Sequence, residues 1–466
     1  MVSRAYLCPV KLSQVEGMGL CMRRIRPACF SCLLFLFLFL WQYAMADYCS
    51  AHGLIDSNDL ENFSGMNLVH STIVTRHGDR TPITTIPGLE EGWNCDAKRQ
   101  SNTFLPSRPS ELVFRRNFLP KRQPLPGNCG LGQLTLRGSL QLSQIGQHLR
   151  ERYISDYKLL SEPLDRSEIF FRSTLIDRTI VSGQSLLQGL FPTDASTLSP
   201  LDLWTIDPST ENLFPNPQSC PRLQQIQKSL LNSSVVRERK QALDDVKTLL
   251  QSALNMTTLP PWSGLFDVFS AMRCHGQPWP IAEEEVERIL SFASFEMAYM
   301  TSTPLSQILG IGTLWEDMLQ QWKMVVEGDS AAPKFALFSG HDSTLTPLLA
   351  SLMQESYKTW PPYASHLIFE LWRNGTNAAM GREGEGEGED LWVYVTYNGQ
   401  AVVLDSTQPT SLLIPWSTFL AKIRPLIPPD WSAMCHSDQE EAVGQLHWSA
   451  AHLSPAGWAS SAGPLD

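Results

Sequence analysis

The feature that most constrains the fold is a short apolar segment that ends in polar residues, which occurs three times along the chain. These segments are rich in β-branched and aromatic residues, as is typical of strands, and they cover residues 67–74, 169–171 and 335–338. The first runs into Arg76-His77, the second into Arg172, and the third into His341-Asp342. Because ligands of open α/β sheets bind beyond the carboxyl ends of the strands, these polar ends predict one shared site.

Helical patterns alternate with these strands. Apolar residues recur at helical spacing over residues 135–153, over 177–190 and in a segment that begins at 344. Two later segments, 366–372 and 391–397, are predicted as paired strands, and the region at about 195–300 is predicted as an inserted, mainly helical cap. The repeated order of strand, loop and helix predicts an α/β fold with a largely parallel central sheet flanked by helices.

The polar strand ends supply the groups that phosphoryl transfer needs. The planar forks of Arg76, Arg80 and Arg172 match phosphate oxygens, and such cations stabilise the charge that these oxygens carry in the transition state. His77 offers a nucleophilic nitrogen that could form a phosphohistidine. Asp342 could protonate the leaving alkoxide and then activate the water that completes the reaction.

Each of these residues also has a purely structural explanation. His341 could donate a hydrogen bond to the phosphate, yet a His341-Asp342 pair before a helix could serve only as a helix cap. Arg172 could serve as an ion-pair partner, and a single R-H-G triplet is a weak signal. The occurrence of all three features in one chain favours function. No step of this chemistry requires a metal or a cofactor, and neither is predicted.

Residues 76–82, R-H-G-D-R-T-P, are similar to the R-H-G-x-R-x-P signature of the histidine acid phosphatases. Residues 172–174 with 177–179 resemble the segment that carries a further phosphate-binding arginine of this family, and 341–342 resemble its distal His-Asp pair. The resemblance extends from about Met66 to the last pair of strands. It implies a nucleophile at His77, phosphate-binding residues at Arg76, Arg80, Arg172 and His341, and a proton donor at Asp342.

Within that family, several stretches resemble the phosphatases that remove the 2-phosphate of xylose in the glycosaminoglycan–protein linkage region. These stretches are residues 132–135, 272–275, 345–347, 367–372 and 397–399. The resemblance predicts a phosphorylated sugar or glycan as the substrate. Two alternatives stay open: a broad-specificity acid phosphatase that is secreted or lysosomal, and a non-catalytic phosphate-binding protein on the same fold.

The N-terminus predicts entry into the secretory pathway. Arg23, Arg24 and Arg26 precede an uncharged apolar run at 28–46, and this order of charge keeps the N-terminus in the cytosol. The run is long enough to span a bilayer as a signal anchor, but its end at Ala44-Met45-Ala46 also has the form of a signal-peptide cleavage site. The resemblance implies a single-pass type II Golgi membrane protein, with residues 1–27 in the cytosol and the phosphatase domain 47–466 in the lumen.

Cysteines and glycosylation sequons agree with a lumenal location. The cysteines after the apolar run are widely spaced, which suits disulfides in an oxidising compartment, although their pairing cannot be read from the sequence. They are Cys49, Cys95, Cys129, Cys220, Cys274 and Cys435. Sequons for N-glycosylation occur at Asn62, Asn232, Asn255 and Asn374.

The overall charge argues against nucleic acid as a partner. The formal net charge is -11 over 466 residues, and an acidic protein repels nucleic acid and anionic membranes. An anionic substrate therefore requires arginines that are concentrated locally. Residues 381–390 alternate glycine with glutamate and contain no apolar residue, which predicts a flexible surface loop. The sequence sets neither the role of that loop nor the oligomeric state.

Overall fold

The computed structural model describes residues 47–51, 63, 65–89, 92–93, 95, 125–192, 200–353, 359–375, 390–404 and 412–437. The chain divides into two compact units, Met1–Ala46 and Asp47–Asp466, and every described element belongs to the second unit. The predicted cytosolic and membrane segments, the sequon at Asn62 and nearly all of the acidic loop 381–390 lie outside the described residues. Within the described ranges, no helix has the length and hydropathy that crossing a membrane requires.

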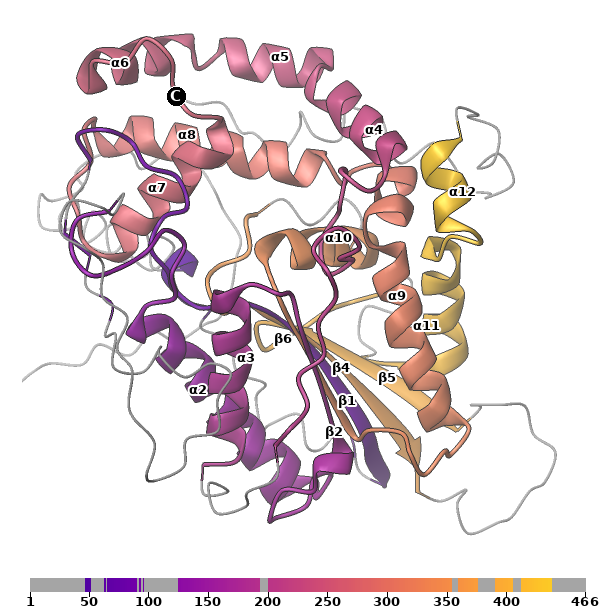
Figure 1. Cartoon of the computed structure of the whole chain (residues 1–466). Coiled ribbons are helices and arrows are strands. Elements are labelled where there is room, and N and C mark those ends of the chain that lie inside the picture. Colours follow the sequence, from indigo (N-terminus) through magenta and orange to yellow (C-terminus); the bar gives the residue numbers. More distant parts are fainter. Residues whose placement is uncertain are drawn as a thin grey trace, which may run out of the picture. The chain divides into compact units, whose positions relative to one another are not determined.

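A seven-stranded mixed sheet forms the centre of the second unit (Figure 1). Its strands run in the order β2-β3-β1-β4-β5-β6, and β7 also pairs with β5. Their bounds are β1 Met66–Arg76, β2 Ile169–Ser173, β3 Phe335–Gly340, β4 His366–Asn374, β5 Leu391–Tyr397, β6 Gln400–Ala401 and β7 Leu413–Pro415. The predicted α/β sheet with flanking helices is confirmed, and all five predicted strands are present.

The sheet differs from the prediction in one respect, because it is mixed and not largely parallel. Strand β3 pairs in parallel with β1 and β2, whereas every pairing of β4, β5, β6 and β7 is antiparallel. Parallel neighbours need long crossover connections, and the helices between β1, β2 and β3 supply them. Strands β4 to β6 follow one another within residues 366–401, which suits antiparallel pairing.

Both faces of the sheet are buried, so its strands carry apolar side chains on both sides. On β4, Leu367 and Phe369 face one core, and Ile368 and Trp372 face the other, as the two-residue period of a strand requires. Strand β1 follows the same rule through Ile73 and Val74, which belong to different cores. The sheet is therefore the middle layer of the unit, with helices on each side.

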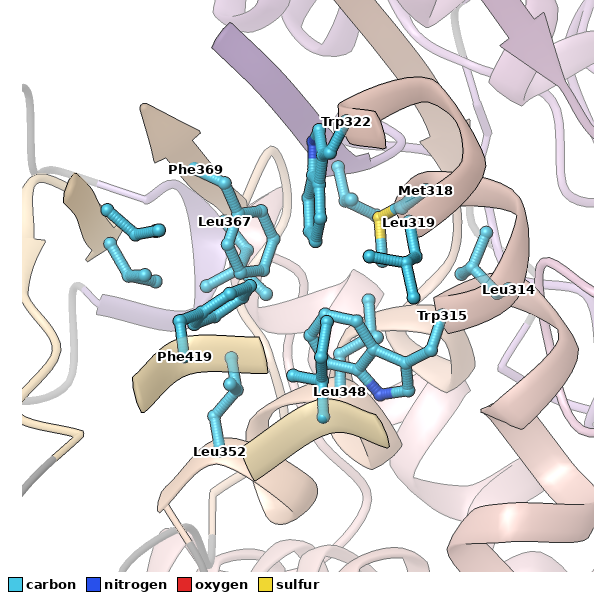
Figure 2. Close-up of a cluster of buried hydrophobic side chains, with 14 of the residues drawn as sticks. Leu314, Trp315, Met318, Leu319, Trp322, Leu348, Leu352, Leu367, Phe369 and Phe419 are labelled. Carbon is cyan, nitrogen blue, oxygen red and sulfur yellow. The ribbon is translucent and has the colours of Figure 1, made fainter. Parts of the chain in front are cut away.

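Helices pack on each face of the sheet (Figure 1). Helices α2 and α3 contribute to one core, and α9, α10 and α11 contribute to the other. Figure 2 shows Trp322 of α9 and Phe419 of α11 beside Phe369, with ring centroids 5.4 and 6.0 Å from that phenyl ring and 5.6 Å from each other. The bounds of these helices are α2 Leu136–Arg150, α3 Asp177–Leu190, α9 Pro304–Val326, α10 Asp342–Met353 and α11 Trp416–Ile423.

A set of helices is inserted between α3 and α9, and all of them except the first contribute to a further core. These helices are α4 Pro221–Leu231, α5 Ser234–Gln241, α6 Asp244–Leu254, α7 Trp262–Cys274 and α8 Glu283–Tyr299. They fall inside the range at about 195–300 that the sequence predicts as a helical cap. The predicted helix at 177–190 is α3, and Thr135 caps α2 by accepting a hydrogen bond from the backbone N–H of Gly138.

Three disulfides join the six cysteines whose pairing the sequence leaves open. They are Cys49–Cys274, Cys95–Cys129 and Cys220–Cys435. The first links the segment before β1 to the end of α7, and the third links the start of α4 to α12 (Trp431–His436). Disulfides of this kind persist in oxidising compartments, so they indicate folding in the secretory pathway.

Candidate active site

The carboxyl end of β1 places the R-H-G segment at the centre of a buried cluster. The backbone N–H of His77 donates to the carbonyl of Gly340 at the end of β3, and its carbonyl accepts from Ala364. The chain then passes directly over the start of α2. A Cβ on Gly78 would lie 2.2 Å from the carbonyl oxygen of Gly138, so only glycine allows this close approach.

His77 presents one ring nitrogen to the cluster. Its Nδ1 lies 2.8 Å from the carbonyl oxygen of Gly78, and because a carbonyl only accepts, Nδ1 carries the proton. The Nε2 lone pair is then available, and Nε of Arg80 points at it from 3.4 Å. Burial lowers the pKa of His77 well below its ordinary value, and Arg178, Arg80 and Arg76 lower it further. Both effects favour the neutral imidazole.

Arg76 is fully buried and held on several sides. Its guanidinium donates to the carbonyl of Pro361 and, through Nη2, to the hydroxyl of Tyr48 at 2.9 Å. The ring of Tyr363 lies 4.4 Å below the guanidinium carbon. The same Nη2 is 2.9 Å from Oδ2 of Asp342, so Arg76 connects the R-H-G segment with the His-Asp pair.

Arg80 is oriented by a carboxylate from the inserted helices. Its Nη1 donates to Oδ1 of Asp267 on α7 at 2.6 Å. The other oxygen of that carboxylate accepts from the backbone N–H groups of Ile83 and Thr84 at 2.6 and 2.9 Å. One side chain of α7 thus fixes both the arginine and the loop that carries it. The sequence analysis did not identify Asp267, since nothing in its local sequence marks it.

His341 and Asp342 lie where β3 passes into α10. The imidazole rings of His341 and His77 are 5.7 Å apart, centroid to centroid. Nε2 of His341 is 3.0 Å from the hydroxyl of Thr174. Burial, together with Arg178, lowers the pKa of His341 to about 3. Both histidines of the cluster are therefore neutral, and both lie among arginine cations.

Asp342 is the first residue of α10, and it is bound through both oxygens. Oδ2 contacts Arg76 and accepts from the indole N–H of Trp360 at 2.8 Å, while Oδ1 accepts from the backbone N–H of Ser343 at 2.8 Å. Burial raises the pKa of this carboxyl group, but Arg76 and the Trp360 hydrogen bond outweigh it and hold the pKa below its ordinary value. The carboxylate form is the stable one beside these donors.

The structure does not bring Arg172 into this cluster. Its Nη2 donates to Glu211 at 2.7 Å and to Asn212 at 2.6 Å, and its Nη1 donates to Asp317 at 3.0 Å. Two carboxylates therefore compensate its charge. This agrees with the alternative stated from the sequence, in which Arg172 serves as an ion-pair partner. Arg172 lies within β2, and its side chain reaches the segment 211–213, whose neighbour Phe214 packs 5.7 Å from the His341 ring.

Arg178, at the start of α3, takes the place that was expected for Arg172. Its Nη2 lies 3.5 Å from Nδ1 of His341, and its Nε has no hydrogen-bond partner among the described residues. Burial, with repulsion from Arg80, lowers the pKa of Arg178 to about 10. The residue is still cationic at neutral pH. The sequence feature that could have identified Arg178 is the D-R-T triplet at 177–179, which lies shortly after β2.

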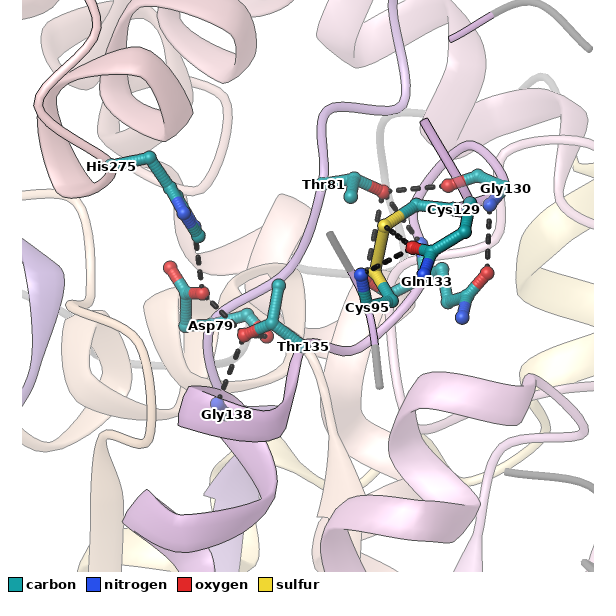
Figure 3. Close-up of a disulfide and its surroundings, with 10 residues drawn as sticks. Asp79, Thr81, Cys95, Cys129, Gly130, Gln133, Thr135, Gly138 and His275 are labelled. Atoms are coloured by element: carbon teal, nitrogen blue, oxygen red, sulfur yellow. Dashed lines mark hydrogen bonds and ion pairs between the residues drawn. A yellow bond between two sulfur atoms is a disulfide. The ribbon is translucent and has the colours of Figure 1, made fainter. Parts of the chain in front are cut away.

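Side chains that do not contact His77 itself support the loop that follows it (Figure 3). The buried carboxylate of Asp79 accepts from the hydroxyl of Thr135 at 2.5 Å and lies 2.9 Å from Nε2 of His275, at the end of α7. Thr81 donates to the carbonyl of Gly130 at 2.7 Å, beside the Cys95–Cys129 disulfide. The inserted helices therefore hold the catalytic loop at two points, through Asp267 and through His275.

The arrangement is suited to one kind of ligand. Two buried arginines, Arg76 and Arg80, and the half-buried Arg178 surround His77, and among the described residues Asp342 and Asp267 are the acidic groups that form ion pairs with them. Such an excess of positive charge in a buried site favours a group with two negative charges, and guanidinium forks match the oxygens of phosphate. Over the described residues, no group of three or more His, Cys, Asp or Glu side chains could hold a metal ion.

Comparison with known proteins gives a consistent result. The family model for the histidine phosphatase superfamily (branch 2) matches residues 67–398. Counting factor 60 of Dictyostelium discoideum is 32% identical over 394 residues, which cover 80% of this chain and 89% of that protein. Testicular acid phosphatase of Homo sapiens is 29% identical over 401 residues, with coverage of 81% and 83%.

Solved structures show the same fold. Hafnia alvei phytase in complex with tartrate superposes with a TM-score of 0.53 at 16% identity, over 80% of this chain and 99% of the phytase. A multiple inositol polyphosphate phosphatase of Bifidobacterium longum in complex with phosphate gives a TM-score of 0.53 at 12% identity, over 81% and 97% of the two chains. At these identities the likeness concerns the fold alone.

Proposed function

The chain belongs to the histidine phosphatase superfamily, branch 2, and is a histidine acid phosphatase that hydrolyses phosphomonoesters; from this premise we propose a role for each residue of the cluster. Arg76, Arg80 and Arg178 bind the phosphate oxygens, and Arg178 replaces Arg172 in the set expected from the sequence. His77 is the nucleophile, and His341 is a further phosphate ligand. Asp342 is the acid and base.

The first step transfers the phosphoryl group to His77. The Nε2 lone pair attacks phosphorus, the bond between phosphorus and the ester oxygen breaks, and that oxygen takes a proton from Asp342 to leave as an alcohol. The pKa of Asp342 is lowered in the free protein, whereas a proton donor must be protonated, and substrate binding reconciles the two. A phosphate dianion between the arginines offsets the charge of Arg76, and the pKa of Asp342 rises as the substrate binds. By the same effect the pKa of His341 rises, and the imidazole becomes a hydrogen-bond donor to phosphate.

The second step releases phosphate. Asp342, now a carboxylate, accepts a proton from water as the water oxygen attacks phosphorus. The bond between phosphorus and Nε2 breaks, the lone pair returns to His77, and inorganic phosphate leaves. The arginines keep their contacts through both steps because the charge stays on the same phosphoryl oxygens.

The single observation that carries this proposal is the tautomer of His77. Its Nδ1–H donates a hydrogen bond to the Gly78 carbonyl. The unprotonated Nε2 therefore lies among the three arginines. We expect His77→Ala to reduce phosphate release from a phosphomonoester by on the order of 10⁴-fold or more. A matched control is His436→Ala, on α12 and exposed. Retention of activity in His77→Ala would contradict the proposed nucleophile, and a ³¹P signal of phosphohistidine in acid-quenched wild type would support it.

For the substrate, we propose the 2-phosphate of xylose in the glycosaminoglycan–protein linkage region. The support is the resemblance of stretches such as residues 272–275 and 367–372 to phosphatases of that specificity. The chain from Asp47 onward should release phosphate from a 2-phosphoxyloside with a higher kcat/KM than from 4-nitrophenyl phosphate. Equal kcat/KM values for the two would favour the broad-specificity alternative, and the catalytic proposal would stand.

For the location, the disulfides place folding in the secretory pathway, and we propose a Golgi membrane protein anchored through residues 28–46. Residues 47–466 would form the lumenal domain, with the insertion at about 195–300 as its cap. The exposed sequons at Asn232 and Asn255 are compatible with glycosylation on the lumenal side. N-terminal sequencing of the mature protein tests the anchor, because an N-terminus at Asp47 would indicate cleavage after Ala46.

A further inference from the structure

A cavity of about 910 Å³ lies within the inserted helices and reaches the proposed proton donor. Residues of α5, α6, α7 and α8 line it, together with the loop that precedes α7. Two residues from outside the insertion, Asp342 and Trp360, complete the wall. A volume of this size is within the range of small-molecule sites, and nothing in the chemistry of the phosphoryl group itself requires it.

The position of Asp342 shows which part of a substrate the cavity would receive. This carboxyl group lies on the boundary between the arginine cluster and the cavity. A general acid must be within hydrogen-bond reach of the oxygen that it protonates, and that oxygen joins the phosphorus to the alcohol. If the phosphoryl group lies among the arginines, the alcohol must therefore extend past Asp342 into the cavity. This step rests on the function proposed above.

The wall nearest Asp342 is aromatic and rigid. Trp360 donates its indole N–H to Asp342, and its ring stacks on Phe266 with centroids 3.9 Å apart. Trp262, the first residue of α7, and Met297 of α8 add apolar surface further along the cavity. Such surfaces favour the apolar face of a ring over a freely hydrated chain.

Two lysines contribute positive charge to the wall of the cavity. Lys240 of α5 and Lys247 of α6 both line it. The ion pairs of this region join Arg288 to Asp245 and Arg273 to Glu287, and among the described residues neither lysine has such a pair. Glu296 is the acidic group of the insertion that lines the cavity with them, and burial raises its pKa although Lys240 opposes the effect. The lining therefore sets two lysines beside two carboxyl groups, Asp342 at the reaction site and Glu296, whose burial favours its neutral form.

We infer that the cavity is the subsite for the leaving group, and that it selects an alcohol that contains a ring and a second acidic group. The ring would lie against the aromatic wall beside Asp342. The acidic group, a carboxylate or an equivalent anion, would lie near Lys240 and Lys247. Specificity would then depend on charge at a distance from the reacting phosphorus, through residues that take no part in the chemistry.

The test uses aryl phosphomonoesters that carry a terminal carboxylate on spacers of increasing length, each matched with its neutral carboxamide. The measured quantity is the ratio of kcat/KM for the acid to kcat/KM for the amide. We expect a ratio of about tenfold at the best spacer, because both lysines are exposed and solvent screens their charge. The Lys240→Gln/Lys247→Gln double variant should bring the ratio close to one, and the corresponding double change to Glu should invert it.

A matched control is Lys228→Gln, an exposed lysine of α4 that does not line the cavity. It removes one positive charge from the same insertion and should leave the ratio at the wild-type value. Thermal unfolding of each variant checks that the insertion still folds.

The possible outcomes separate this inference from the proposed function. A wild-type ratio close to one at every spacer, with phosphate released from both esters, would overturn the subsite and leave the phosphatase assignment intact. A high ratio that survives in the double Gln variant would overturn the role of the lysines. Absence of phosphate release from every ester, amide and acid alike, would reject the proposed function and the subsite with it.

Discussion

Two buried arginine clusters lie against the same sheet and differ in how their charge is compensated. In the first, which we name the closed cluster, Nε and Nη2 of Arg152 each donate to an oxygen of Glu370 at 2.6 Å. Tyr153 and Trp372 donate to the same carboxylate at 2.9 and 3.2 Å. The second is the open cluster of Arg76, His77, Arg80, Arg178, His341 and Asp342, in which Arg178 forms no ion pair with an acidic side chain among the described residues.

The difference shows how buried charge can be used for structure or for binding. A buried charge is costly unless it is paired and hydrogen-bonded, and the closed cluster meets this condition within the chain. The open cluster meets it only in part, since Arg178 keeps an unsatisfied Nε among the described residues. The positive charge of the open cluster is therefore incompletely compensated in the free protein, which costs stability. An anionic ligand that binds there would compensate the charge and stabilise the protein.

The largest effect should follow from breaking the closed cluster. Glu370→Gln leaves the Arg152 guanidinium buried beside a neutral amide, so we expect a loss of about 3–5 kcal/mol in the free energy of unfolding. Chemical denaturation measures this loss. Because the open cluster is untouched, kcat/KM per folded molecule should change little. A variant as stable as the wild type would show that Arg152 finds another partner, and would remove the contrast between the clusters.

The next largest effect should come from Arg178 in the open cluster. Arg178→Ala removes a proposed phosphate ligand, and we expect kcat/KM to fall on the order of 10²–10³-fold. The free energy of unfolding should stay the same or rise, because repulsion with Arg80 is relieved. Phosphate release and denaturation, measured on the same preparation, test both parts.

Arg172→Ala is the matched control for Arg178→Ala. It leaves the buried carboxylate of Glu211 without its ion-pair partner, so we expect a loss of about 3 kcal/mol in the free energy of unfolding. The value of kcat/KM should fall by less than about tenfold. The opposite pattern, with Arg172 essential for turnover and Arg178 dispensable, would restore the assignment first made from the sequence.

The smallest of the three effects concerns the pH dependence of the free energy of unfolding. It involves His70, a buried histidine of β1 that forms hydrogen bonds within the protein. Its Nδ1 donates to the carbonyl of Pro333 at 2.7 Å, and its Nε2 lies 2.8 Å from the hydroxyl of Thr72. Burial lowers the pKa of His70 to about 4. Below pH 6.5 the unfolded chain binds a proton at this residue and the native state does not. The contribution of His70 to the free energy of unfolding is therefore fully present above pH 6.5. It is lost as the pH falls towards 4.

This loss should amount to about 3 kcal/mol between pH 7 and pH 4. His70→Gln should flatten the pH dependence of the free energy of unfolding by that amount. Inorganic phosphate should not change the contribution of His70, whereas it should reduce the acid sensitivity that His341 causes in the open cluster. An unaltered pH profile in His70→Gln would show that His70 does not stay neutral in the native state.

Most of the sheet and its flanking helices could be predicted because their patterns are local. The period of apolar residues identified α3 to its bounds and placed the strands within a few residues. The antiparallel half of the sheet could not be predicted in the same way, since pairing direction depends on which strands become neighbours. Helix α9 was missed, although it supplies Trp315 and Trp322 to the largest core, because its region offered no chemical motif to draw attention to it.

The residues of the open cluster were found where they belong to contiguous motifs, as at Arg76, His77, Arg80 and at His341-Asp342. Arg172 was predicted as a site residue because it follows the apolar segment 169–171, and its carboxylate partners at 211 and 317 could not be foreseen from spacing. Asp267 and Trp360 orient Arg80 and Asp342 from distant parts of the chain. Such supporting contacts are set by tertiary packing, which no single motif encodes.

The Cys49–Cys274 disulfide, which spans 225 residues of sequence, has a consequence for the order in which a working enzyme is assembled. Tyr48, next to one sulfur, contacts Arg76, and His275, next to the other, contacts Asp79. Closing this bond therefore brings together the two sides of the arginine cluster in one event. We therefore expect a newly made chain with reduced thiols to complete its phosphate-binding centre only after oxidation, so that catalysis begins in the compartment where the thiols are oxidised.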